Sequence, residues 1–559
     1  MRRLTAALIL LMGGCAVAQG AEAVPVPVPV PRPVPIVGPA SVAPAEVVPL
    51  KELPPDVCLL LRLADGTRRS ARWTVSPFAA LFATAWGKGV AEQVRTQPGP
   101  FQLLAQLAPA QQVTLGMTSN RGQPVGHVLA HLRDPAIATA MVATLTARPA
   151  TAVMDGLEVR ATLPLFAARL EGLFKPRAPG LNNGLYWSWD DLLPLPATVL
   201  AAPINPLSDI DMQWQTAAPW AVAGGSVTGG SVTSGSVTSG SATAAPAAVA
   251  SLAVHAEWQV TPYGVHELVH LSGVPTPPSI GGAAGAVERT VFAGLPADTV
   301  WAISSAPLPA LIEQIPGLTS DQLNAWMKRQ DLPSWTSVKP QLGSALIWMQ
   351  QGVPLPALTI DIRMPQETAT AALAWLDAKH QFSPGSDGVH LGALGFIPLQ
   401  AAWQQGSLVI TTSSGGIAGA IARPGGFAAV PVIAEALKAL PSGDLLLAGV
   451  SRSGESWASL AAVAPWLTRR KPELATLAND LRQAGSFGFI SLRRDHEQLE
   501  IDAGGLFGGP LSTTAILGGF FRAATGDRGG ERPARAERQR QEPRPEAPPL
   551  VEPPKQVEF

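Results

Sequence analysis

Residues Gly343–Phe382 read GSALIWMQQGVPLPALTIDIRMPQETATAALAWLDAKHQF, and the chain is organised around the unit that this segment predicts. Two runs rich in apolar residues flank a turn that contains glycine and proline, which is typical of a pair of antiparallel strands. After Pro365 the pattern changes to helical spacing, with Ala372, Leu373 and Leu376 on one face. The stretch therefore predicts a hairpin followed by a helix that packs on it.

The same order of elements recurs in Gln112–Arg148, which reads QVTLGMTSNRGQPVGHVLAHLRDPAIATAMVATLTAR. A strand at 113–117, an Asn-Arg-Gly turn and a strand at 125–132 are expected to precede a helix. Asp134 and Pro135 are typical of an N-cap and of the first helical residue, so the helix is expected to begin there. The second occurrence of this hairpin–helix unit indicates an internal repeat.

Further segments of the two halves correspond in the same order. The hairpin predicted at 251–274 matches the strands predicted at 486–505, and the strand at 209–215 matches the segment that begins at Asp444. We therefore expect an α+β fold with two tandem repeats of mainly antiparallel sheet and packed helices. The expected organisation is a first repeat at 56–275 with a low-complexity insert at 221–250, a linker at 276–290, and a second repeat at 291–507.

The N-terminus has the layout of a secretory signal. Two arginines precede a short apolar run, and the A-V-A sequence that ends at Ala18 is a typical cleavage site, so residues 1–18 are predicted to be removed. Cys15 offers a second interpretation, in which it is the lipidated cysteine of a lipoprotein. Both interpretations predict an exported protein, in the periplasm or at the cell surface.

The two flanks of the repeats have compositions that favour disorder. Residues 19–55 are rich in alternating valine and proline, which predicts a stiff extended spacer. Residues 508–559 mix charge and proline with few apolar groups, which predicts a disordered tail. The uncharged segment 504–521 is long enough to be an alternative membrane anchor, although it is rich in glycine and contains Pro510. A membrane is therefore expected as a partner only through lipidation at Cys15 or through 504–521.

The composition limits the classes of partner. The chain has a formal net charge of -1, with 47% hydrophobic and 14% charged residues. No basic face with interleaved aromatic residues occurs in the sequence, so nucleic acid is not an expected partner. Removal of the signal would leave Cys58 as the one remaining cysteine, within an apolar run, where we expect it to be a buried small side chain.

Residues 266–270 read HELVH and match the H-E-x-x-H motif, in which a helix presents two histidines to zinc and the glutamate acts as the base. The surrounding sequence favours a strand, because a T-P-Y-G turn is followed by alternation with a period of two. In a strand the helical spacing of the ligands is lost. We therefore expect no catalytic residue, cofactor or metal ligand, with a zinc-dependent hydrolase that uses His266, Glu267 and His270 as the alternative.

The second half opens on the segment Leu295–Thr299, LPADT, before a predicted strand. Together with the hairpin–helix unit that follows, it resembles an uncharacterised family of exported bacterial proteins whose repeats begin with such a segment. The resemblance covers about 295–505 and, more faintly, 54–275. It implies an envelope location and brings no known activity and no catalytic residues. We expect a non-enzymatic structural or binding role, with envelope proteins or cell-wall material as partners, and a membrane-anchored assembly factor as a further alternative.

Overall fold

The computed structural model describes residues 53–509 with internal gaps. The gaps are residues 85–86, 89–109, 121–122, 147–150, 164–191, 203, 218–250, 275–285, 316–317, 319, 352–355, 386, 395–396, 463–475, 486, 496–497 and 507. The signal segment, residues 19–52 of the spacer, the insert at 221–250 and residues 510–559 therefore lie outside the described residues, and the expectations for them remain predictions.

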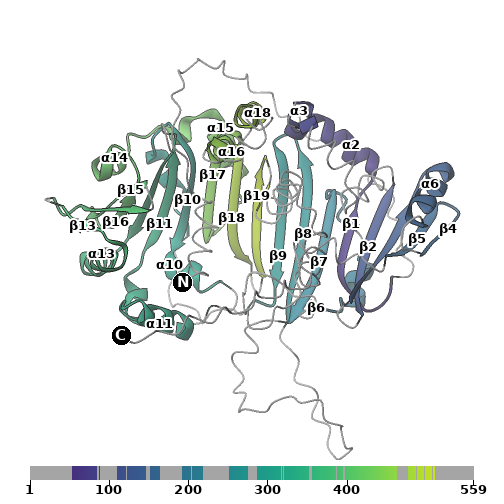
Figure 1. The fold of residues 1–559 in the computed structure, drawn as a ribbon, viewed down its shortest axis with the longest axis horizontal. Helices are drawn as coiled ribbons and strands as arrows, with labels where there is room; N and C mark the ends of the chain where they lie inside the picture. The colour runs from purple at the N-terminus through teal and green to yellow at the C-terminus, as the bar shows by residue number, and fades with distance from the viewer. Residues whose placement is uncertain are drawn as a thin grey trace, which may run out of the picture.

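Nineteen described strands form one sheet that extends across the whole molecule (Figure 1). Those before residue 275 are β1 (Val57–Leu63), β2 (Gln112–Asn120), β3 (Gln123–His131), β4 (Thr151–Asp155), β5 (Glu158–Leu163), β6 (Leu192–Leu193), β7 (Ile210–Ala217), β8 (Ser251–Thr261) and β9 (Gly264–Ser272). Those after residue 290 are β10 (Thr299–Pro307), β11 (Ser344–Gln350), β12 (Ala357–Arg363), β13 (Ser383–Pro384), β14 (His390–Leu394), β15 (Ile397–Gln404), β16 (Ser407–Thr411), β17 (Leu447–Arg452), β18 (Phe487–Asp495) and β19 (Gln498–Gly505).

The pairing of the strands is antiparallel throughout and follows a similar plan in both halves. In the first half β1 lies between β2 and β7, and in the second half β10 lies between β11 and β17. The strands β7, β8 and β9 are consecutive neighbours, as are β17, β18 and β19. The halves meet where β9 pairs with β19 over eight residue pairs, from Val265 opposite Gly505 to Ser272 opposite Gln498. The α+β class with a large antiparallel sheet is therefore confirmed.

Helices cover the upper edge and both ends of the sheet. Those of the first half are α2 (Gly66–Val75), α3 (Pro77–Ala83), α6 (Pro135–Thr146) and α8 (Ala197–Ala201). Those of the second half are η2 (Arg289–Gly294), α10 (Leu308–Ile312), α11 (Ser320–Arg329), α12 (Trp335–Val338), η3 (Lys339–Gln341), α13 (Gln366–His380), α14 (Gly416–Ala422), η4 (Phe427–Ala429), α15 (Pro431–Ala439), α16 (Ser453–Ala462) and α18 (Leu477–Ala484). Figure 1 places α2, α3, α15, α16 and α18 along the upper edge, with α6 at one end and α13 at the other.

The two hairpin–helix units form as predicted. β11, β12 and α13 make the unit of the second half, and β2, β3 and α6 make that of the first. Asp134 caps α6, because its Oδ1 accepts a hydrogen bond of 2.8 Å from the backbone N–H of Ala136. Both helices pack on apolar side chains of the sheet, Ala138 and Met141 of α6 in the larger core of the first half and Leu373 of α13 in a smaller core at the far end.

The two faces of the sheet differ between the halves. Residues directly opposite each other on antiparallel strands share a face, so the register assigns each side chain. On one face, Trp214, Val254 and Val269 belong to the core of the first half. On the other face, Trp348 and Phe489 belong to the core of the second half, where α14, η4 and α15 cover them. Over the strands of the first half this second face carries a small apolar cluster around Leu60 and Leu195, and beside it a row of charged residues.

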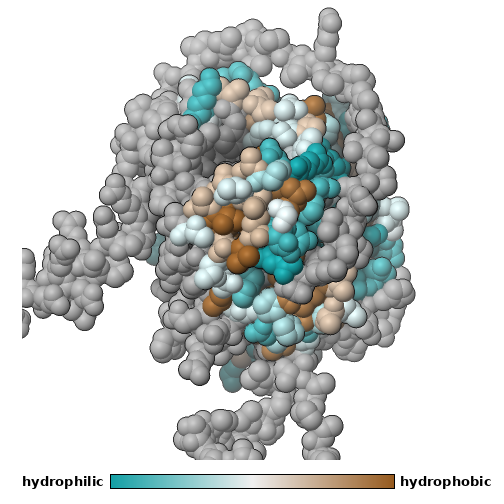
Figure 2. All heavy atoms as spheres, turned by 90° about the vertical axis from the view of Figure 1, so that its right-hand side faces the viewer, coloured by the Kyte–Doolittle hydropathy of each residue, from teal (hydrophilic) through white to brown (hydrophobic). Residues whose placement is uncertain are grey.

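The end of the sheet formed by β4, β5 and α6 presents a mixed surface. Figure 2 views this end and shows hydrophobic and hydrophilic side chains intermixed. On the edge strand β4, Val153 and Met154 are 65% and 41% exposed. Such an unpaired edge is normally shielded by charge or by a covering element, and here the chain folds α6 beside it.

Some elements differ from expectation. The strand expected at 444–450 is β17, which runs from Leu447 to Arg452. The helix expected over 457–484 appears as α16 and α18, with the residues between them outside the described part. Val287 and Arg289, which we expected in the linker, belong to the second half, where Val287 is buried in its core. Among the described residues, no helix is long and apolar enough to cross a membrane.

Candidate functional site

The HELVH segment lies in strand β9, so the prediction of a strand at 265–271 is confirmed. Thr261 pairs with Gly264 across a tight turn at the start of the strand, as the T-P-Y-G sequence predicts. His266 and His270 share one face, while Glu267 points to the other and is buried. The glutamate required by the hydrolase alternative therefore lies across the sheet from both histidines.

Each of these two histidines faces a carboxylate of the neighbouring strand β19. His266 Nε2 lies 2.7 Å from Asp502 Oδ1. His270 Nδ1 lies 3.6 Å from Glu500 Oε2, and Arg493 on β18 donates from Nε to Glu500 Oε1 at 2.7 Å. These contacts join side chains of the two halves across the β9–β19 pairing.

A buried ion pair lies on the same face, on strands β1 and β7, and β8 lies between it and β9. Arg62 on β1 donates from Nη2 to Asp211 Oδ2 on β7 at 3.1 Å, and both side chains are buried. Gln213 donates from Nε2 to Asp211 Oδ1 at 3.0 Å. Burial by itself would raise the pKa of Asp211, but the hydrogen bond with His255 and the charge of Arg62 outweigh it and hold the pKa below its ordinary value.

His255 on β8 lies between two carboxylates. Its Nε2 is 3.3 Å from Asp211 Oδ2 and 3.4 Å from Glu257 Oε1. The other oxygen of Glu257, Oε2, accepts hydrogen bonds from Asn205 Nδ2, at 2.6 Å, and from Ser208 Oγ. On its far side, the ring of His255 lies 5.9 Å from the ring of His270, measured between centroids.

Together these residues form a continuous row of charged and histidine side chains, which we name the histidine–carboxylate belt. Its members are Arg62, Asp211, His255, Glu257, His266, His270, Arg493, Glu500 and Asp502. The register places all of them on one face, because they lie opposite one another or two residues apart along a strand. Two arginines contribute +2 and four carboxylates contribute -4, so the belt carries a net charge of -2 when its histidines are neutral.

Sequence reasoning singled out His266, Glu267 and His270 but not the remainder of the belt. The signal for the first half of the belt is the alternation in DIDMQWQ, residues 209–215, which puts Asp211 and Gln213 on the face opposite Met212 and Trp214. The alternation predicts a half-buried strand, but it does not show which side chains of other strands lie beside Asp211.

The remaining candidates do not form a second site. Cys58 is buried, as expected, and its Sγ donates to the carbonyl oxygen of Met117 at 3.2 Å. Ala18 and Cys15, the predicted cleavage and lipidation residues, lie outside the described residues.

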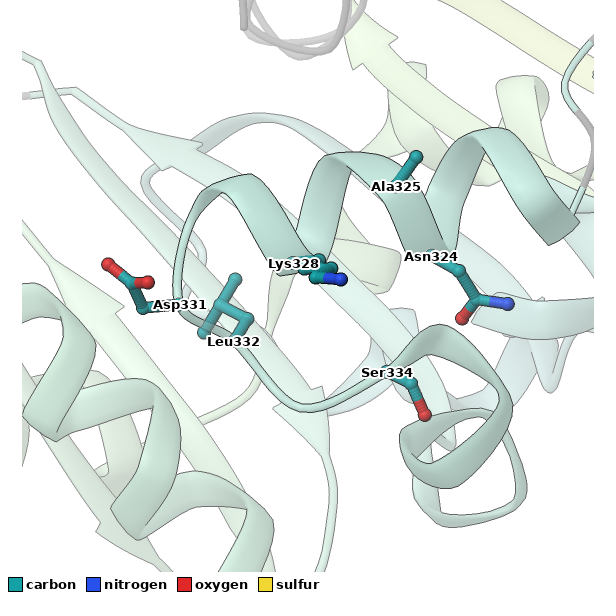
Figure 3. A pocket seen from close by; sticks show the side chains of 6 residues that line it. All are labelled: Asn324, Ala325, Lys328, Asp331, Leu332 and Ser334. Atoms are coloured by element: carbon teal, nitrogen blue, oxygen red, sulfur yellow. The ribbon is translucent and has the colours of Figure 1, made fainter.

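A surface hollow beside α11 is remote from the belt. Figure 3 shows its lining, which comes from α11 and the loop that leads to α12: Asn324, Ala325, Lys328, Asp331, Leu332 and Ser334. Asp331 is engaged by Lys379 of α13 at 2.8 Å. The residues that line the hollow do not form a catalytic or metal-binding group.

No protein family model, no curated protein and no solved structure matches this chain.

Proposed function

We propose that this protein is an exported, non-enzymatic binding protein of the bacterial envelope, and that the histidine–carboxylate belt binds a positively charged ligand. The observation that carries the proposal is the convergence of nine charged or histidine side chains from six adjacent strands on one face of the sheet. These side chains pair with one another, and the three histidines among them remain partly exposed, so the belt is open to a ligand from solvent. The net negative charge of the belt favours a cation.

The geometry of β9 argues against a hydrolase of the H-E-x-x-H type. In such enzymes the glutamate must reach a water molecule on the metal that the two histidines hold. Here the Glu267 carboxylate is on the other face and bonds to Trp258 Nε1 at 2.8 Å. The plane of the sheet therefore separates the base from the two histidines.

We further infer that the two halves are tandem repeats that pair through their last strands. The support is the similar order of neighbouring strands in the two halves. β1 lies between β2 and β7, and β10 lies between β11 and β17. The shared position of α6 and α13 after the second hairpin strand adds to it. In this proposal β9 and β19 are the last strands of the two repeats, and the belt crosses the pairing between them.

The cation proposal is tested by thermal unfolding of the purified protein at low ionic strength, with and without spermidine. We expect spermidine to raise the Tm of the wild type, because a ligand that binds the folded state stabilises it. The double variant Glu500→Gln/Asp502→Asn should lose most of this shift. The matched control Asp331→Asn/Glu435→Gln removes two charges outside the belt and should keep it. Equal shifts in both variants would overturn the proposal.

The non-enzymatic part is tested with chromogenic peptide and ester substrates. We expect no turnover that depends on Glu267. Turnover by the wild type that Glu267→Gln abolishes would favour the hydrolase instead.

The export proposal is tested on the protein recovered from a bacterial expression host. Mass spectrometry of the N-terminus should find residue 19 after cleavage at Ala18, or a lipid-modified Cys15. An intact Met1 on protein that stays in the cytoplasm would contradict export. The outcome also decides between the soluble and lipid-anchored forms, and the segment 504–521 remains the alternative anchor.

A further inference from the structure

We infer that Asp211, His255 and Glu257 form a binding site for a divalent transition-metal ion, with zinc as the best chemical match. This inference rests on the proposal that the belt binds a cation, and it names the ligand of its central part. One ligand atom from each residue lies within 4.8 Å of the others. Two of these separations, 3.3 Å and 3.4 Å, involve Nε2 of His255.

The separations suit the geometry of zinc. Four ligand atoms at about 2.0–2.1 Å from zinc in a tetrahedron lie roughly 3.3 Å from one another. The distances from His255 Nε2 to the two carboxylate oxygens are close to this value. The remaining separation, between the two carboxylates, is no more than 4.8 Å, so a bound ion would draw these two side chains of β7 and β8 together.

His255 cannot satisfy both of the carboxylate oxygens that it faces, whereas a metal ion could bind both. Nε2 of a histidine carries at most one hydrogen, so it can donate fully to only one of the two carboxylate oxygens that it faces. A divalent cation can bind the neutral Nε2 and both oxygens at once. It would also offset the two carboxylate charges that the fold brings together on adjacent strands.

The surrounding residues already hold the carboxylates in an orientation suitable for binding a metal. Gln213 holds Asp211 through Oδ1, and Asn205 and Ser208 hold Glu257 through Oε2. The oxygens that face His255 are Glu257 Oε1 and Asp211 Oδ2, and the latter also accepts from Arg62 Nη2 at 3.1 Å. Such outer hydrogen bonds are typical of metal sites, where they fix the ligating oxygen.

The type of ligand and the exposure narrow the choice of ion. One imidazole nitrogen with two carboxylates suits zinc and the neighbouring transition metals, whereas calcium and magnesium prefer oxygen ligands alone. The His255 side chain is 34% exposed, so an ion can reach the site from solvent. Arg62 lies on the buried side, where it bonds to Asp211 and reduces the negative charge, which predicts moderate rather than very tight binding.

The site differs from the one that the HELVH motif suggests. His266 pairs with Asp502 and lies on β9, outside the group of three. The histidines at 255 and 266 thus provide a matched comparison, since each is a partly exposed strand residue on the same face beside a carboxylate.

The experiment uses the purified full chain, made without a polyhistidine tag, stripped with a chelator and titrated with zinc by calorimetry. Cobalt(II) absorption provides a second readout of the ligand set. We expect one zinc per chain in the wild type and in His266→Ala, and at least a tenfold loss of affinity in His255→Ala. Glu257→Gln, which keeps the size and the hydrogen-bonding groups of the side chain, should show the same loss if His255→Ala fails to fold.

Three outcomes would overturn the inference. They are no zinc binding by the wild type, equal affinity in the 255 and 266 variants, or a loss confined to His266→Ala. If spermidine still raises the Tm while zinc does not bind, the metal site fails and the cation-binding proposal stands. If zinc binds through His255 while spermidine has no effect, the belt binds a metal ion and not an organic polycation, and the metal site stands.

Discussion

Trp258 Nε1 donates a hydrogen bond of 2.8 Å to Glu267 Oε2, on the face of the sheet opposite His266 and His270. The two residues are directly opposite each other on β8 and β9. This contact gives the motif glutamate a structural task, because a buried carboxylate needs partners for its oxygens. It also explains why a strand can hold the HELVH sequence.

The Glu267 contact is tested by a pair of substitutions. Glu267→Ala should lower the free energy of unfolding by about 1–3 kcal/mol, because it leaves the partly buried Trp258 N–H without this acceptor. Glu267→Gln keeps a carbonyl oxygen in reach and should cost less. Urea unfolding of both variants measures the difference. A larger loss in Glu267→Gln than in Glu267→Ala would contradict this role.

The buried pair of Arg62 and Asp211 should contribute far more than an exposed one. Arg62→Met removes the cation and leaves a buried carboxylate, so we expect a loss of about 3–5 kcal/mol in unfolding free energy. Arg133 forms an ion pair with Asp65 in which it is half exposed, and Arg133→Met should cost about 0–1 kcal/mol. Denaturant unfolding compares the two, and similar losses would show that the Arg62 pair is not desolvated in solution.

The helices α16 and α18 approach each other through two glycines. A Cβ on Gly454 would overlap the Cα of Gly485 and the carbonyl oxygen of Leu481. Gly454→Ala should therefore destabilise the fold by about 1–3 kcal/mol through overpacking. Gly419, inside α14, has nothing within 4 Å of an added Cβ, so Gly419→Ala should stabilise by about 0.5–1 kcal/mol. Thermal unfolding should show a lower Tm for Gly454→Ala and a higher Tm for Gly419→Ala. Tm shifts of the same sign in both variants would contradict the close approach of α16 and α18.

His127 on β3 should make stability depend on pH. Burial lowers its pKa below the ordinary value, although the charge of Asp56 acts in the other direction. The unfolded chain therefore binds more protons, so this contribution to stability is complete above the unfolded pKa of about 6.5 and is lost as pH falls through the folded pKa. His127→Gln removes the titration. We expect the wild type to lose more stability than the variant between pH 8 and pH 5, measured by urea midpoints, and parallel curves would contradict the assignment.

Local patterns predict the elements of this fold better than they predict its site. The hairpin–helix units are readable because Asp134 and Pro135, or the spacing of Leu373 and Leu376, act within one segment. The start of β17 is harder to predict from the sequence, because residues 445–450 are uniformly apolar and show no alternation.

The belt depends on contacts that local patterns do not contain. Arg62, Asp211, His255 and Glu500 come from strands that are far apart in the chain and adjacent in the sheet. The pairings of β1 with β7 and of β7 with β8 bring the first three together, and the pairing of β9 with β19 adds Glu500. Periodicity gives the face of each side chain, but not the neighbouring strand.

The pairing of β9 with β19 makes one sheet and one belt from the two halves of the chain. Hydrogen exchange of the full chain, followed by mass spectrometry, tests it most directly through peptides that cover 264–272 and 498–505. We expect both peptides to be protected as strongly as β8 and β18, since backbone groups paired on both sides exchange only by large-scale opening. Rapid exchange in both peptides, with β8 and β18 still protected, would show two separate sheets and contradict the account.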